Sequence, residues 1–121
     1  MSVLAIAAAI VIAVTAMIHS VAGEQRMIRP LLASGSFSTM PRVGRAMRFT
    51  WHMSSLLMVL TAFTIAWPGT PTPLVLLIGA AYLGLGLLAL AMTKGRHVSG
   101  PLFTAAGLLA FIFVIVGQRQ S

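Results

Sequence analysis

The sequence predicts an all-α integral membrane protein, built as a bundle of four helices with both termini outside the cytoplasm. Hydrophobic residues make up 59% of its 121 residues and charged residues only 7%, whereas soluble domains carry about 25% charged residues. Four apolar segments are also long enough to cross, or nearly cross, a hydrocarbon layer roughly 30 Å thick at ~1.5 Å of rise per residue. Basic residues lie unevenly between these segments, and this asymmetry predicts the orientation.

Each expected span has recognisable ends. The first covers residues 3–22; it exceeds the core of a signal peptide and has no basic residue before it, so we expect it to be retained. The second covers residues 49–67 and ends at the turn signal Trp67-Pro68-Gly69. The third covers residues 74–92, and the fourth covers residues 101–117, with Pro101 suited to a first helical turn.

The basic residues predict one transmembrane domain, residues 1–121, with a cytoplasmic loop at residues 23–48. That loop holds five of the eight basic residues, namely Arg26, Arg29, Arg42, Arg45 and Arg48. Lys94 and Arg96 follow the third span, and Arg119 alone lies near the C-terminus. The positive-inside rule therefore places the loops after the first and third spans in the cytoplasm. We expect a multi-pass protein of a bacterial inner membrane, and no nucleic-acid binding, because the charge is explained by topology.

Small residues indicate how the spans pack. Ala5, Ala9 and Ala13 recur at every fourth position of the first span, and Ala80 and Gly84 do so on the third. Such residues let helix backbones approach closely in a bilayer. We expect both sets to pack within the chain in preference to forming a homodimer.

Polar residues gather where the first span meets the Arg-rich loop. His19 lies three residues before the end of its span and His52 three residues after Phe49, so both are expected within about 5 Å of the same boundary. The chain's one carboxylate side chain, Glu24, is close by. Helical spacing adds Thr15, Ser20 and Ser55 to this face, and Trp51, next to His52 in the sequence, is counted with them.

Two interpretations of this face remain open. In the first, Glu24 is a structural clamp that pairs with Arg45 or Arg48, and the histidines bond to nearby hydroxyl or backbone groups. In the second, His19, Glu24 and His52 bind a divalent metal ion, or His19 and His52 are axial ligands of a haem. The absence of cysteine leaves only histidine, glutamate and methionine as candidate ligands.

Two segments carry a resemblance. His19-Ser20-Val21-Ala22-Gly23-Glu24 and Arg48-Phe49-Thr50-Trp51-His52-Met53-Ser54-Ser55 match the pattern H-S-x-x-G-E … R-x-x-W-H-x-x-S. The pattern resembles that of uncharacterised small four-span bacterial membrane proteins, over roughly the first half of the chain. The resemblance implies that His19, Glu24, Arg48, Trp51 and His52 belong together, and it implies no activity.

In overall shape the chain is also similar to the small multidrug resistance transporters, which have four helices and a lone glutamate in the first. Their glutamate lies in mid-membrane, however, whereas Glu24 lies at a helix end, and their characteristic first-helix sequence is absent here. A small transporter is therefore the least favoured function.

The sequence contains no arrangement typical of a catalytic nucleophile, so we do not expect an enzyme. We expect an accessory or assembly subunit of a larger respiratory or photosynthetic inner-membrane complex, in contact with lipids and protein partners. The alternative is a metal- or haem-binding membrane protein that uses His19, His52 and Glu24.

Overall fold

The structure, a computed structural model, describes residues 2–119 and the side chains of residues 2–117. Over this range the chain is helical, with short turns and no strands. The elements, in chain order, are α1 (Val3–Gly23), the π-helical turn η1 (Glu24–Ile28), α2 (Arg29–Ala33), α3 (Pro41–Ala66), α4 (Thr72–Thr93) and α5 (Ser99–Arg119). The continuous stretch Val3–Ala33 and α3, α4 and α5 are each long and apolar enough to cross a membrane, which confirms the expected fold class of a multi-pass four-helix protein.

The expected loop at residues 23–48 is wrong in its extent. Most of it is helical, because the first helix continues to Ala33 and α3 begins at Pro41, leaving only residues 34–40 as a turn. Arginine is a good helix former, so a polar sequence does not by itself end a helix outside the apolar layer. The third and fourth spans agree with the structure to within a few residues, and the second agrees at its end but not at its start. Pro101 does lie in the first turn of α5.

The first helix passes Pro30 by widening one turn. Pro30 has no N–H to donate, and in a regular α-helix its ring would collide with the carbonyl four residues earlier. The N–H of Arg29 instead bonds to the carbonyl of Glu24, five residues back, which makes η1 a π-helical turn. The helix therefore carries Pro30 without ending, and Glu24 is the first residue of the widened turn.

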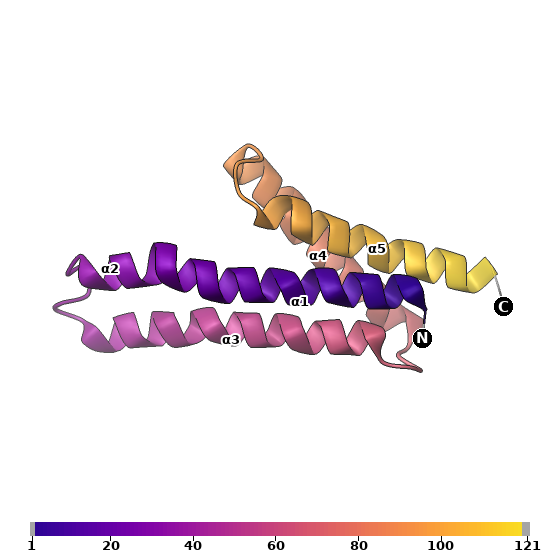
Figure 1. Ribbon diagram of the computed structural model, residues 1–121, viewed down its shortest axis with the longest axis horizontal. Helices are drawn as coiled ribbons and strands as arrows, with labels where there is room; N and C mark the ends of the chain where they lie inside the picture. The colour runs from indigo at the N-terminus through magenta and orange to yellow at the C-terminus, as the bar shows by residue number, and fades with distance from the viewer. Residues whose placement is uncertain (1, 120–121) are drawn as a thin grey trace.

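The helices form two antiparallel hairpins (Figure 1). One joins α1 to α3, and the other joins α4 to α5. Helix α1 packs on both α3 and α5, whereas α3 and α4 scarcely meet. The hairpins lie close together near the termini and diverge toward the turn that links α4 to α5, as Figure 1 shows.

The core consists of small and branched apolar residues. Helix α1 contributes Ala5, Ala8, Ile12 and Ala16, all at most 3% exposed, because it lies between two neighbours. Ala5 is therefore buried as expected, whereas Ala9 and Ala13 are only partly buried, so the small-residue stripe on α1 is rotated from the predicted one.

The expectation that Ala80 and Gly84 of the third span pack within the chain is wrong. Ala80 and Gly84 are exposed, and a Cβ added at Gly84 would meet nothing within 4 Å. The close approach is made instead by Gly79 and Gly107, where a Cβ on Gly107 would lie 2.8 Å from the carbonyl oxygen of Gly79. Helices α4 and α5 thus pack through glycines, in the manner of membrane helices, but on a different face of α4.

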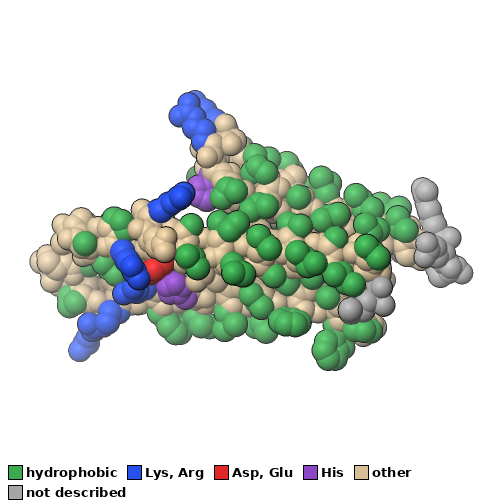
Figure 2. All heavy atoms as spheres, viewed as in Figure 1, with side chains coloured by type: hydrophobic (Ala, Val, Ile, Leu, Met, Phe, Trp, Pro, Cys, Tyr) green, Lys and Arg blue, Asp and Glu red, His purple; other side chains and the backbone are tan. Residues whose placement is uncertain are grey.

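Among residues 2–117, the charged side chains lie toward one end of the molecule. Figure 2 shows arginine and lysine around the end that carries α2 and on the turn between α4 and α5, with apolar side chains over the rest of the visible face. The only acidic side chain is seen among them, next to histidine. The helices therefore bring the two basic regions of the sequence to one side of the apolar layer.

Candidate functional site

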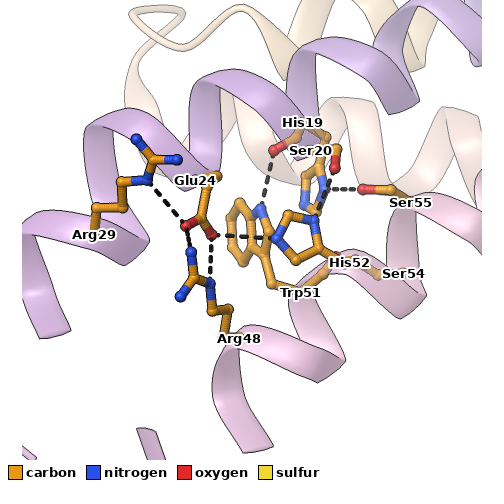
Figure 3. A network of polar contacts seen from close by, with 9 residues as sticks. All are labelled: His19, Ser20, Glu24, Arg29, Arg48, Trp51, His52, Ser54 and Ser55. Carbon is orange, nitrogen blue, oxygen red and sulfur yellow. Dashed lines mark hydrogen bonds and ion pairs between the residues drawn. The ribbon is translucent and has the colours of Figure 1, made fainter. Parts of the chain in front are cut away.

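The polar residues selected from the sequence meet where η1 and the end of α1 pack against α3 (Figure 3). The first helix supplies one histidine, one serine and the glutamate, and α3 supplies an arginine, a tryptophan, a histidine and a serine. We call this set the polar junction: His19, Ser20, Glu24, Arg48, Trp51, His52 and Ser55. Arg29, of α2, joins it from the following turn.

Glu24 is the centre of the junction and is only 8% exposed. The guanidinium of Arg48 forms hydrogen bonds to both carboxylate oxygens of Glu24. Its Nε donates to Oε2 at 3.2 Å, and its Nη2 donates to Oε1. Arg29 Nε donates to Oε1 at 3.4 Å, and His52 Nε2 lies 3.2 Å from Oε2. A two-pronged arginine–carboxylate pair is among the stronger polar contacts in proteins, so Glu24 ties η1 to α3.

The two histidines are held by serines in a crossed arrangement. His19 Nδ1, on α1, lies 2.9 Å from Ser55 Oγ on α3. His52 Nδ1, on α3, lies 2.8 Å from Ser20 Oγ on α1. Each helix therefore gives one imidazole and one hydroxyl to the other, and the two bonds fix the rotation of both helices about their axes.

Trp51, on α3, packs against α1 beside His19. Its indole N–H donates to the backbone carbonyl of His19 at 2.9 Å, and its ring stacks on the His19 imidazole with centroids 4.1 Å apart and planes 9° from parallel. The indole also lies over Gly23, where an added Cβ would fall 2.5–2.6 Å from three of the ring atoms. Glycine at position 23 is thus required by the closeness of Trp51.

The geometry separates the two interpretations of the site. Glu24 contacts Arg48, as the clamp predicts, and also His52, but no contact joins it to His19. Both ring nitrogens of His52 already have partners, Ser20 and Glu24, which leaves neither one aimed at a bound ion. Within residues 2–117, no three His, Cys, Asp or Glu side chains are grouped so that they could hold a metal ion.

The metal and haem interpretations therefore gain no geometric support and stay predictions. A bis-histidine haem would need His19 and His52 to face each other across the iron, whereas His52 Nε2 points to Glu24. An absorption spectrum of the purified protein, combined with elemental analysis, tests both interpretations directly.

One predicted clamp partner, Arg45, and one residue of the predicted polar face, Thr15, take no part in the contacts of the polar junction. Arg45 forms no ion pair with Glu24 among the described residues, so Arg48 is the clamp partner of the two that the sequence offered. Thr15 is buried but donates to the Val11 carbonyl of its own helix at 2.7 Å. Arg29 was missed; it reaches Glu24 because residues five apart share a face in a π-helical turn, and Pro30 was the only sign of that turn.

Comparison of the chain with protein-family models, with curated proteins and with solved structures finds no match.

Proposed function

We propose that this protein is a non-catalytic accessory or assembly subunit of a larger complex in a bacterial inner membrane, of the respiratory or photosynthetic kind. The observation that carries the proposal is an open groove between α3 and α4. It has a volume of about 440 Å³, and its lining is almost wholly apolar, with Leu57, Met58, Leu77 and Ala81 among its residues.

The groove suits a transmembrane helix of a partner protein. Helices α3 and α4 scarcely touch, so the bundle is incomplete along this flank. Ala81 lines the groove, and Ala80 and Gly84 lie exposed on the same helix, so a foreign backbone could approach α4 closely. The hydroxyls within reach are already engaged, since Thr61 Oγ1 and Tyr82 Oη lie 2.7 Å apart. Ser54, which also lines the groove, donates to the Trp51 carbonyl at 2.6 Å, so the groove offers packing and no unpaired hydroxyl group.

The polar junction supports a structural role for the α1–α3 hairpin. Every buried side-chain nitrogen and oxygen in the described part of the chain has a hydrogen-bond partner, and Glu24 is shared by three cationic or imidazole groups. An acid held by an arginine on each of two elements is suited to fixing the hairpin and poorly suited to exchanging protons. A hairpin fixed by these contacts leaves its apolar flank on α3 open to a partner helix.

Site-directed photocrosslinking in native membranes tests the proposal. A photoreactive amino acid at Ala81, inside the groove, is expected to crosslink to one protein partner in high yield. The matched control is Leu60, which is 52% exposed on α3 and does not line the groove. Gentle extraction should also retrieve the partner in stoichiometric amount. Recovery of a lone monomer or a homo-oligomer, with no heterologous crosslink from Ala81, would overturn the proposal.

A further inference from the structure

A second cavity lies on the other side of His19, where α1 and the start of α5 diverge. It has a volume of about 400 Å³ and is distinct from the partner groove, although His19 and Phe103 border both cavities. His19 and Trp51 of the polar junction form part of its wall. Its lining includes the apolar residues Ile18, Leu102 and Phe103. Its lining also includes Arg26 and His97, two exposed residues from the basic end of the molecule.

We propose that this cavity binds one anionic phospholipid, with the phosphate held by Arg26 and His97 and part of an acyl chain against Ile18, Leu102 and Phe103. The cavity has the two chemical parts that such a molecule needs, a cationic part and an apolar part. The location also suits a lipid, because the basic residues gather at one end of helices that are otherwise apolar.

The charge balance of the chain favours an anionic occupant. The chain has eight Lys and Arg residues but a single acidic side chain, Glu24. That side chain is already bound by Arg48 and Arg29. Arg26 makes no hydrogen bond or ion pair with any described residue. An external phosphate supplies the counter-charge that the chain does not contain, and arginine binds phosphate through several N–H groups at once.

The hydrogen bonding of His97 prepares it for the same ligand. Its Nδ1 accepts the backbone N–H of Ser99 at 3.2 Å and lies 2.7 Å from the Ser99 hydroxyl. With Nδ1 acting as an acceptor, the proton of a neutral imidazole resides on Nε2, which has no partner among the described residues. His97, which lines the cavity, therefore has an Nε2–H donor that no described residue uses, in its neutral form as well as in its charged form.

Native mass spectrometry of the full-length protein in detergent tests this site. The probes are phosphatidylglycerol and phosphatidylcholine with identical acyl chains. The wild-type protein is expected to retain one phosphatidylglycerol molecule in preference to phosphatidylcholine. The double variant Arg26→Gln, His97→Gln should lose roughly tenfold in phosphatidylglycerol affinity, as expected for removing its charged contact. Arg42→Gln removes the same formal charge outside the cavity and should bind as the wild type does.

Two further measurements keep the result interpretable. Circular dichroism checks that each variant keeps its helix content. Glycerophosphoglycerol, the same headgroup without acyl chains, should bind far more weakly than the lipid. The proposal is overturned if Arg42→Gln weakens binding as much as the cavity variant does, since charge alone would then explain it. Equal binding of phosphatidylcholine, tight binding of the bare headgroup, or an acidic protein bound at Arg26 in place of lipid would also overturn it.

Discussion

Each ring nitrogen of His52 has a partner in the polar junction, and this limits what the residue can do. Its Nδ1 is paired with Ser20 and its Nε2 with Glu24. His52 therefore links the histidine–serine contacts to the contacts around the Glu24 carboxylate. His19 differs, because only its Nδ1 is bonded and its ring borders two cavities. At the scale of single residues, the junction thus contains one histidine that is fully engaged and one that is half engaged.

The contact between Glu24 and Arg48 predicts that substitutions of Arg48 and Arg45 will differ in their effect on stability. Arg48→Gln removes the two-pronged contact, while Glu24 keeps its weaker contacts to Arg29 and His52. We expect the Tm of the protein in detergent micelles to fall by roughly 5 °C, since a largely buried carboxylate loses its best partner. Arg45→Gln removes an equal charge without touching Glu24 and should leave the Tm unchanged. Equal losses in the two variants would show that Arg48 acts only through net charge.

The close contact between Gly23 and Trp51 predicts that a larger residue at position 23 will disturb the packing of α1 against α3. In Gly23→Ala, the new methyl group would fall on the indole of Trp51, so α1 and α3 must separate or Trp51 must turn away. We expect a loss of about 1–3 kcal/mol in the free energy of unfolding. The fluorescence of Trp51, recorded in a Trp67→Phe background, should change at the same time. Gly117→Ala places a methyl where nothing lies within 4 Å and is the control.

The sequence allowed the members of the junction to be predicted better than their pairing. His19, Glu24, Arg48 and His52 could be grouped because they lie at the same depth at one end of two antiparallel helices. Which side chain bonds to which depends on how far each helix is rotated about its axis. The π-helical turn changes that rotation by about one residue, and the sequence marks it only by Pro30.

At the scale of elements, the helix lengths were underestimated wherever a helix leaves the apolar layer. Hydropathy gave the spans within α4 and α5 because those helices are apolar almost throughout. It placed the start of α3 at Phe49, eight residues after its true start at Pro41, because residues 41–48 hold three arginines. Hydropathy measures where apolar residues end, whereas a helix ends where its hydrogen-bond ladder stops.

The glycine contact between α4 and α5 predicts that Gly107→Ala will destabilise the protein, and Gly84→Ala is the matched control. In Gly107→Ala, the added Cβ would lie 2.7 Å from the Cβ of Leu83, so the helices must move apart. We expect a destabilisation of about 1–3 kcal/mol, measured by unfolding in mixed micelles. Gly84→Ala adds the same methyl group to open space and should be neutral or slightly stabilising, because alanine favours the helix. If both variants behaved alike, glycine flexibility rather than packing would be the cause.

At the scale of the whole molecule, both basic turns lie toward the same side, where the hairpins diverge, and the turn between α3 and α4 lies at the far end (Figures 1 and 2). This arrangement agrees with the charge pattern from which the orientation was inferred. Which of the two ends faces the cytoplasm follows from the positive-inside rule alone and is open to direct measurement.

Labelling of introduced cysteines measures the orientation, and the chain has no native cysteine to interfere. Thr39→Cys and Val98→Cys, both exposed at the basic end, should react with a membrane-impermeant maleimide only in inverted vesicles. Pro68→Cys, in the opposite turn, should react only in intact spheroplasts. Labelling of all three sites from both sides would indicate dual topology and contradict the charge argument.

The solitary carboxylate also gives the protein a built-in reporter. A protease specific for glutamate and aspartate has one cleavable bond in the whole chain, after Glu24. That bond lies in the π-helical turn, and its side chain is held by three partners, so cutting requires the turn to open first. The rate of a single cut, giving two fragments, would therefore read out how often the α1–α3 hairpin opens locally, and any molecule that steadies the hairpin would slow it.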